Sequence, residues 1–439
     1  MKFLLTVLTI LTSLGFAEWH IETVDSTGHV GYHTSLALDS SGYPHISYVA
    51  GGGQTVKYTY WDNSTWQVDT VIDITGGDFY ILSTSLALGS TGEPHISLTI
   101  ADLYLSWIVY SYLDGSDWQI EEPAGLYSSN SSLELDSSDY PRFSYTSTHL
   151  EYASWDGSNW QNEIVDPVSN VLATTSLELD SSEYSHISYY DCVDDDLLYA
   201  CWDGSAWQTE TIDSVGQVGQ CSSLRLDLAQ CPHIAYKATT NGDLKYANWN
   251  GSDWHIETVD SVGTVGWWVS LDLDSSGYPH ISYYDYTNED LKYAFWDGSV
   301  WNLEIVDSSG SVGKYTSLEL DSQGNPHITY YDETNQDLKY AYGYETGIEG
   351  PIGNEDFLLH PICPNPASGT INVSFTTSES ATVDLYVYDV SGKLVRESLA
   401  VVYSAGVNQV RFSGLITGLH LCQMVSEGFT ATQRFIVIE

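Results

Sequence analysis

Three of the short segments that precede a predicted strand are rich in aromatic residues. The segments hold Tyr32 and His33, Trp267 and Trp268, and Lys314 and Tyr315. Aromatic rings suit sugars, because the C–H face of a sugar ring is apolar while its hydroxyls stay hydrated. We expect the five aromatic residues of these segments to form one glycan-binding patch. The alternative is that the rings pack between neighbouring structural units.

A second pattern places oxygen-bearing side chains in one turn at a fixed spacing. It occurs as Asp191-x-x-Asp194-x-Asp196, Asp285-x-x-Asn288-x-Asp290 and Asp332-x-x-Asn335-x-Asp337. Crowded carboxylate and amide oxygens suit calcium. The alternative is ordinary turn chemistry, in which these side chains accept hydrogen bonds from the backbone. No motif in the sequence calls for a cofactor, and calcium is the one ion that these turns could bind.

Motifs of other chemistry are missing from the sequence, which has no nucleophile elbow, no P-loop and no metalloprotease helix. Residues 18–344 contain Arg142 and Arg225 but no other arginine, too few for the carboxylate clamp of a sialidase. A glycosidase needs only two carboxylates. Acids are so abundant that the sequence neither supports nor excludes that chemistry.

The net charge of the chain excludes some classes of binding partner. It has 59 acidic against 13 basic residues, a formal net charge of −46. Such a surface repels nucleic acid and anionic lipid, and it keeps an extracellular protein soluble. We expect a monomer that binds no nucleic acid.

A repeat of 42 to 52 residues positions the chemistry-bearing segments. Each unit opens with a tryptophan: Trp19, Trp66, Trp118, Trp160, Trp207, Trp254 and Trp301. Every unit holds four short runs of alternating apolar residues, bounded by Gly, Asp, Asn, Ser or Pro, which predicts four strands. Tight turns such as "LDSSGYP" and "WDGS" predict antiparallel hairpins. Four-stranded units of this period are typical of the blades of a β-propeller.

The phase of the repeat predicts seven blades and the way the ring closes. If "SLDLD" is the innermost strand, the chain starts with an outermost strand at Trp19–Asp25. The repeat ends at Lys339–Tyr344 with a blade that lacks its outermost strand. We therefore expect Trp19–Asp25 to pair with Lys339–Tyr344 and latch the ring. Blades six, seven and one are then neighbours, so the three aromatic segments lie close together.

Most recurring residues have a predicted role in the scaffold. The opening tryptophan is expected to pack between blades, and the first-hairpin aspartate to form an Asx-turn. The aspartates are Asp39, Asp136, Asp180, Asp227, Asp274 and Asp321. A histidine follows at His45, His95, His186, His233, His280 and His327, with Arg142 in blade three. A buried hydrogen-bonding role is favoured for these histidines over a ring of metal ligands.

The N-terminus has the features of a signal peptide. Lys2 precedes the apolar run Phe3–Leu14, and Gly15-Phe16-Ala17 provides a small-x-small cleavage site. The run is too short for a membrane span, so we expect residues 1–17 to be removed. Export permits disulfides, and Cys192–Cys221 and Cys363–Cys422 are the two candidate bridges.

The C-terminal residues follow a different pattern. After a linker at 345–355, residues 356–439 show alternating strands with Gly turns, which predict a small antiparallel sandwich. Its landmarks are Pro364-Asn365-Pro366, then Tyr388, Asp389 and Gly392 of "YDxxG", then Leu415 and Gly418 of "LxxG". They resemble the type A sorting domain of the type IX (Por) secretion system. The resemblance covers roughly the last 80 residues. It implies export of a folded cargo through the type IX machinery, usually with removal of this domain and attachment to the cell surface. His420 stands where tyrosine is usual, and Glu439 where a basic residue is usual. With these departures, the resemblance implies export more strongly than attachment to the cell surface.

These observations predict an all-β protein: residues 18–344 form a seven-bladed propeller and residues 356–439 a sorting domain. It is secreted to the extracellular space or the outer cell surface. Two functional classes remain. The favoured class is a surface binding or adhesion module, with Tyr32, His33, Trp267, Trp268 and Tyr315 contacting a glycan or other surface ligand. The alternative is a secreted glycan-active hydrolase of propeller fold.

Overall fold

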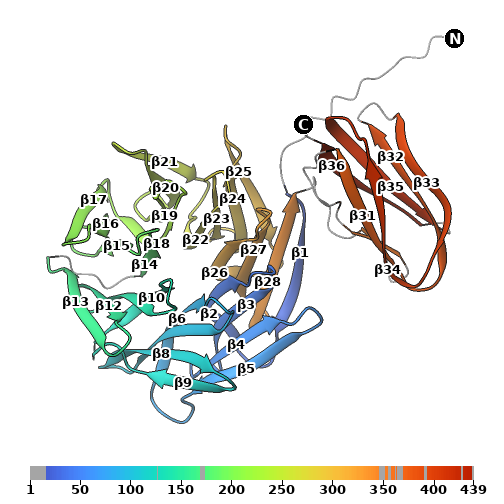
Figure 1. Ribbon diagram of the computed structural model, residues 1–439. Coiled ribbons are helices and arrows are strands. Elements are labelled where there is room, and N and C mark those ends of the chain that lie inside the picture. Colours follow the sequence, from blue (N-terminus) through green and yellow to red (C-terminus); the bar gives the residue numbers. More distant parts are fainter. Residues whose placement is uncertain are drawn as a thin grey trace. The chain divides into compact units, whose positions relative to one another are not determined.

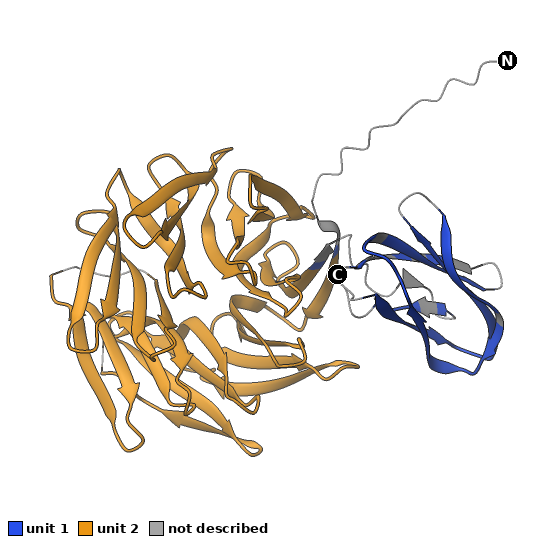
Figure 2. Ribbon diagram, turned by 45° about the horizontal axis from the view of Figure 1, so that its top comes forward, with its two compact units in different colours: residues 1–19, 343–439 blue, residues 20–342 orange. Residues whose placement is uncertain are grey.

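A computed structural model describes residues 16–125, 127–168, 174–345, 352–353, 357–360, 362, 369–389, 393–426 and 429–437. These residues fold as strands that fall into two compact units, one of them spanning His20–Tyr342. Figure 2 colours the two units separately. No helix in the described ranges is long and apolar enough to cross a membrane.

The larger unit consists of seven four-stranded antiparallel sheets, the predicted blades (Figure 1). Blade 1 contains β2 (Val30–Leu38), β3 (Pro44–Ala50), β4 (Thr55–Trp61) and β5 (Trp66–Asp73). Blade 2 contains β6 (Tyr80–Leu88), β7 (Pro94–Ala101), β8 (Ser106–Asp114) and β9 (Asp117–Glu121). Blade 3 contains β10 (Ser129–Leu135), β11 (Pro141–Thr146), β12 (Leu150–Trp155) and β13 (Trp160–Asp166). Blade 4 contains β14 (Thr175–Leu179), β15 (Ser185–Asp191), β16 (Asp196–Trp202) and β17 (Trp207–Asp213).

The remaining blades follow the same order from the innermost to the outermost strand. Blade 5 contains β18 (Val218–Leu226), β19 (Pro232–Ala238), β20 (Asp243–Trp249) and β21 (Trp254–Asp260). Blade 6 contains β22 (Trp267–Leu273), β23 (Pro279–Asp285), β24 (Asp290–Trp296) and β25 (Trp301–Asp307). Blade 7 contains β26 (Val312–Leu320), β27 (Pro326–Asp332) and β28 (Asp337–Glu345), and its fourth strand is β1 (Phe16–Asp25).

The position of β1 confirms the predicted latch. This N-terminal strand pairs with β28 at the outer edge of blade 7. Its last residue, Asp25, reaches blade 1, where its carboxylate accepts hydrogen bonds from Tyr48 (2.8 Å) and Lys57 (2.7 Å). The N-terminal strand therefore completes blade 7 and also ties it to blade 1. A closed ring leaves no exposed sheet edge between the first and last blades.

A ring of serines on the innermost strands joins all seven blades. Each serine hydroxyl accepts a hydrogen bond from a leucine N–H of the next blade, at 3.0 to 3.1 Å. The last of these bonds, from Leu36 N–H to Ser317, closes the circle between blades 1 and 7. A backbone donor on an innermost strand has no other strand beyond it, so the neighbouring blade must satisfy it.

The recurring residues have the scaffold roles that their positions predict. Six tryptophans lie edge-on or tilted near a tyrosine of the preceding blade, with ring centroids 5.3 to 5.7 Å apart. All six histidines form a hydrogen bond between Nδ1 and a tyrosine hydroxyl of the same blade. The first-hairpin aspartates accept backbone hydrogen bonds in their turns, as Asp39 does from Ser41 and Tyr43. These three predictions are confirmed.

The C-terminal unit is a two-sheet sandwich. One sheet contains β29 (Ile352–Gly353), β30 (Phe357–Leu359), β31 (Thr370–Thr377) and β34 (Gly406–Ser413). The other contains β32 (Ala381–Asp389), β33 (Leu394–Tyr403), β35 (Gly418–Ser426) and β36 (Phe429–Val437). Side chains of both sheets, such as Phe375 and Met424, form the core. Strand β29 lies within the stretch predicted as a linker and belongs to this sandwich. Pro364-Asn365-Pro366 and Gly392 lie outside the described residues. His420, the departure from the usual tyrosine, is buried, and its Nδ1–H lies 2.9 Å from the Gly418 carbonyl.

Candidate functional site

The aromatic segments lie on the innermost strands of blades 1, 6 and 7 rather than before these strands, where the sequence predicted them. They occupy the beginnings of β2, β22 and β26. The strands extend this far because each contains a bulge, seen as a shift of register with its partner strand. Within the bulges His33, Trp268 and Tyr315 have positive φ, at 50°, 49° and 55°. Such a backbone is uncommon for large side chains, and a bulge with this geometry re-aims the side chain it carries.

A glycine two residues before each bulge brings the strand close to the preceding blade. Gly31 and Gly313 have φ of +95° and +100°. A Cβ on Gly31 would lie 2.9 Å from the Cα of Leu338, and one on Gly313 would lie 2.7 Å from the Cα of Leu291. No side chain fits in that space, so glycine is required where the innermost strand begins.

The five predicted residues form one continuous group of rings. The Trp268 and Tyr315 ring centroids are 4.8 Å apart, and those of Tyr315 and His33 are 4.3 Å apart. Tyr32 lies 6.1 Å from Tyr315, and Trp267 lies 6.0 Å from Trp268. The ring of blades thus brings residues 32–33 and 267–268 together, as the order of the blades predicts.

A pocket lies at one end of the central channel. Three of the five residues line it, and the other two pack behind them in a second layer. Every blade contributes to its lining, and it encloses about 780 Å³, open solvent at its mouth included. His33, Trp268 and Tyr315 line it; Tyr32 and Trp267 do not. Tyr32 stacks on Tyr331 at 4.3 Å behind the pocket, and its hydroxyl accepts a hydrogen bond from that tyrosine.

Trp267 packs in the second layer against a buried lysine. The Nζ atom of Lys237 lies 4.7 Å from the centroid of the Trp267 ring and donates to the Val265 carbonyl at 3.0 Å. Lys237 is 1 % exposed. Its burial lowers the pKa of the ammonium group. Lys237 stands where blades 4, 6 and 7 have a tyrosine, a difference in the repeat that could have been found in the sequence.

The pocket is electrically neutral. Its described lining is made of Ser, Thr, Asn, Cys, Val, Trp, Tyr and His side chains, without a carboxylate, lysine or arginine. Burial lowers the pKa of His33 to about 4, so the imidazole is uncharged at neutral pH. Hydroxyl groups and aromatic rings are thus the chemistry that the pocket offers to a ligand.

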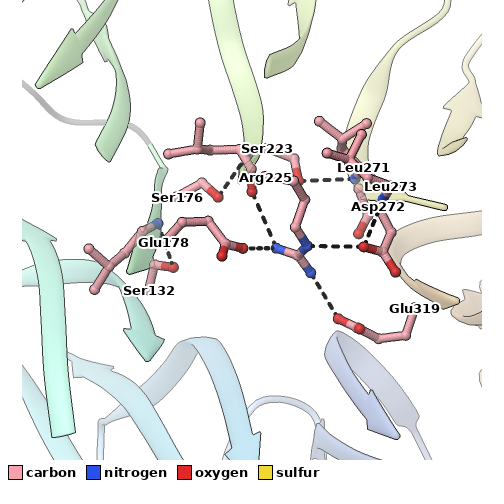
Figure 3. Close-up of polar contacts among 12 residues, drawn as sticks. Ser132, Ser176, Glu178, Ser223, Arg225, Leu271, Asp272, Leu273 and Glu319 are labelled. Atoms are coloured by element: carbon pink, nitrogen blue, oxygen red, sulfur yellow. Dashed lines mark hydrogen bonds and ion pairs between the residues drawn. The ribbon is translucent and has the colours of Figure 1, made fainter. Parts of the chain in front are cut away.

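The other end of the channel holds a charged cluster that sequence reasoning missed (Figure 3). Arg225 follows Cys221 of the pocket by four positions on β18, about 13 Å along the strand. Its guanidinium contacts Glu178 at 2.6 Å, Glu319 at 2.8 Å and Asp272 at 3.5 Å. These residues occupy one position of the repeat, the x of "SLxLD", so the sequence contained the signal.

The carboxyl groups of this cluster have raised pKa values. Burial raises the pKa of Glu319 to about 8, against the opposing effect of Arg225 and with the support of neighbouring acids. Burial raises the pKa of Glu134, Glu178 and Asp272 as well. Arg225 contacts three of these carboxyl groups, and its charge also lowers the pKa of the fourth, Glu134, against the effect of burial.

The first aspartate of each acidic turn accepts hydrogen bonds within the turn, as Asp191 does from Val193 N–H at 2.8 Å. Asp285 accepts hydrogen bonds from Thr287 N–H and from the backbone and side-chain N–H groups of Asn288. Asp332 and Asn335 repeat this pattern. Among the described residues, no group of three His, Cys, Asp or Glu side chains is arranged to hold a metal ion.

The predicted Cys192–Cys221 disulfide is wrong, because the two sulfur atoms are not bonded to each other. Cys221 sits in the bulge of β18 with a φ of 53° and lines the channel pocket, which directs it toward the channel. The Cys363–Cys422 prediction involves Cys363, which lies outside the described residues. Cys422 is buried in the core of the sandwich, and burial raises the pKa of its thiol to about 12.

Comparison with known proteins agrees with both parts of the chain. Residues 361–439 match the family described as "Secretion system C-terminal sorting domain". The fold of the larger unit is similar to that of catalytically inactive virginiamycin B lyase from Staphylococcus aureus, with 7 % identity, a TM-score of 0.51, and coverage of 74 % of this chain and 99 % of that chain. It is also similar to an ulvan lyase of a new polysaccharide lyase family, with 11 % identity, a TM-score of 0.50, and coverage of 75 % and 94 %.

A search of curated protein sequences gives no match. At these identities the two solved structures indicate the fold alone. The sorting domain assigns the chain to export by the type IX secretion system. The protein is a secreted, extracellular or cell-surface, seven-bladed β-propeller with a C-terminal sorting domain.

Proposed function

We propose that this secreted propeller is a surface binding module that holds a neutral glycan at the mouth of its channel without cleaving it. The observation that carries the proposal is the continuous aromatic face of Trp268, Tyr315 and His33 on the rim of a hydroxyl-lined pocket. Aromatic faces stack on the apolar faces of sugars, and hydroxyl side chains both donate and accept hydrogen bonds. The bulged strands and the contacts between the rings hold these rings in place before a ligand arrives, which reduces the entropy lost on binding.

The charge of the protein supports a neutral ligand. The described lining contains no lysine or arginine that could form an ion pair with a sugar carboxylate or sulfate. The chain carries a formal net charge of −46, which repels anionic polysaccharides at a distance. A neutral glycan is therefore the class that the pocket suits best.

Binding is favoured over turnover because glycosidases use a pair of carboxyl groups next to the scissile bond. No carboxyl group lines the channel pocket in the described part of the chain. Secretion places the propeller among extracellular polysaccharides, where a binding module can serve adhesion.

One observation favours the alternative, a glycan-active hydrolase. At the charged end of the channel, Glu319 has a pKa raised to about 8, as suits a general acid at neutral pH. A second pocket there is lined by Glu134, Glu178, Glu319 and Arg225. Release of reducing ends from neutral polysaccharides, lost in Glu319→Gln, would assign the protein to this class.

The test of the binding proposal uses the mature full-length protein on an array of neutral and acidic glycans. We expect binding to neutral glycans, and loss of at least tenfold in affinity in Trp268→Ala. Trp268→Phe keeps a stacking ring and should retain most of the affinity. Trp249→Ala is the matched control, because Trp249 lies on the third strand of blade 5 away from the pocket. If Trp268→Ala folds as the parent does and binds every glycan with unchanged affinity, the aromatic face is scaffold and the proposal is wrong.

A further inference from the structure

We propose that grooves between neighbouring blades form a second set of sugar sites, each taking one neutral monosaccharide unit. The proposal does not depend on the channel-mouth site. Two such grooves are open pockets, one between blades 3 and 4 and the other between blades 7 and 1. They enclose about 650 and 780 Å³, open solvent at their mouths included.

The two grooves are built from equivalent positions of the repeat. Each has two tryptophans and a hairpin tyrosine from one blade, and a glutamate from the outermost strand of the other. In the first groove these are Trp202, Trp207, Tyr184 and Glu163; in the second they are Trp61, Trp66, Tyr43 and Glu22. The glutamate stands three residues after the opening tryptophan of its own strand, a position that is acidic in all seven repeats.

The tryptophan N–H groups distinguish these grooves from two others. In the groove between blades 2 and 3, Trp160 Nε1–H donates to Glu121 at 2.9 Å. In the groove between blades 4 and 5, Trp254 Nε1–H donates to Glu210 at 3.1 Å. In the open grooves, the equivalent Nε1 atoms of Trp66 and Trp207 are buried and have no hydrogen-bond partner, and the same holds for Trp301 between blades 5 and 6.

Unpaired buried donors are rare in folded proteins and call for an explanation. The equivalent N–H in the capped grooves reaches the groove glutamate, so this edge of the indole faces the acid. A group that both donates and accepts would satisfy the two sides at once, donating to the carboxylate and accepting from the indole. A sugar hydroxyl is such a group.

The tryptophan pairs provide the apolar part of the site. The rings of Trp61 and Trp66 are 5.7 Å apart and inclined at 66°, and those of Trp202 and Trp207 are 5.7 Å apart and inclined at 64°. The inclined pair presents one ring face and one ring edge, and a sugar ring can stack on the face while its hydroxyls point to the acid. The first groove is also lined by Glu183 and by Arg142, whose charge is paired with Asp136 at 2.8 Å. The groove glutamates repel sugar carboxylates, so the ligand class is a neutral sugar with free hydroxyls.

The experiment observes the indole N–H groups of the 15N-labelled full-length protein by NMR while sugars are added. The probes are D-glucose, D-galactose, D-mannose, L-fucose and N-acetyl-D-glucosamine at millimolar concentration, with D-glucuronate as the acidic comparison. Single Trp→Phe variants assign the signals. We expect the signals of Trp66 and Trp207 to shift with at least one neutral sugar, and those of Trp160 and Trp254, which are capped by glutamate, to stay in place.

Two variants make the result specific to the grooves. Glu163→Gln should weaken the response of Trp207 by at least fivefold and leave that of Trp66 unchanged. Trp268→Ala should leave both responses unchanged, so failure at the channel mouth and failure in the grooves are distinguishable. The proposal is overturned if no neutral sugar shifts Trp66 or Trp207, or if the capped Trp160 and Trp254 shift equally.

Discussion

Replacing Arg225 by methionine tests whether the charged cluster holds the blades together. The guanidinium contacts Glu178 of blade 4, Asp272 of blade 6 and Glu319 of blade 7 at 2.6, 3.5 and 2.8 Å. Methionine keeps much of the volume and removes the charge. The carboxyl groups then face one another across the channel without a cation.

The expected loss follows from the cost of leaving a buried charge without its partner, about 3–5 kcal/mol. The loss does not scale with the number of acids, because crowded carboxyl groups take up protons instead. For a domain of this size the melting temperature should fall by about 5–10 °C at pH 8. Arg142→Met is the matched control, because Arg142 contacts a single acid, Asp136, at 2.8 Å.

The pH dependence gives the sharper test. Burial raises the pKa of folded Glu319 to about 8 from an ordinary value of 4.5. A raised folded-state pKa means that the group's contribution to stability is fully present below pH 4.5 and is lost as the pH rises through 8. Removing Arg225 raises these pKa values further, so the variant should lose more stability at pH 8 than at pH 5.

Thermal and urea unfolding of the mature protein at pH 5 and pH 8 measure the difference. Equal losses at the two pH values, or a loss at pH 8 no greater than that of Arg142→Met, would refute this account of the cluster.

Three further expectations concern the latch, the channel pocket and the serine ring. Asp25→Asn weakens the charged bonds across the ring closure and should cost about 1.5–3 kcal/mol at pH 7 in urea unfolding, close to the cost of Asp307→Asn inside the ring. The hydrogen bonds from Lys57, Thr27 and Tyr48 lower the pKa of Asp25 despite its burial. The difference in unfolding free energy between Asp25→Asn and the parent should therefore shrink as the pH falls through this lowered pKa. Glycan affinity should stay constant from pH 8 to pH 5 and fall as His33 takes up a proton near pH 4, which isothermal titration checks. Ser317→Ala leaves the buried Leu36 N–H without its acceptor and should cost about 1–3 kcal/mol of unfolding free energy, and a cost near zero would show that the ring bond is dispensable.

Local chemistry explains why much of the fold could be predicted. The Asx-turn of Asp39 and the glycines of the outer hairpins act over two to four residues, so their pattern marks each turn in the sequence. Repetition then multiplies the signal, since the same turns recur at the same phase in seven units. The phase also placed Trp19–Asp25 on the outer edge of the last blade, because that edge had no other strand to fill it.

The site was predicted in part. Order along the chain made blades 6, 7 and 1 neighbours, and the structure brings Trp268, Tyr315 and His33 together as expected. The sequence could not predict which rings face the channel, because a bulge breaks the regular alternation of side chains between the two faces of a strand. Tyr32 and Trp267 therefore pack behind the pocket although their neighbours line it.

The sequence by itself determined the number of blades, the latch and the scaffold roles of the recurring residues, because each rests on short-range turn chemistry or on the period of the repeat. The sorting domain was predicted from the resemblance of its motifs to a known family. The tertiary structure decided which residues of the "SLxLD" position contact Arg225 and which grooves between blades are open. Equivalent positions on different blades, 47 residues apart in Glu178 and Arg225, become neighbours only when the ring closes. The pKa values of the cluster and the unpaired tryptophan N–H groups of the grooves depend on burial. This burial arises from packing between blades rather than from any one repeat.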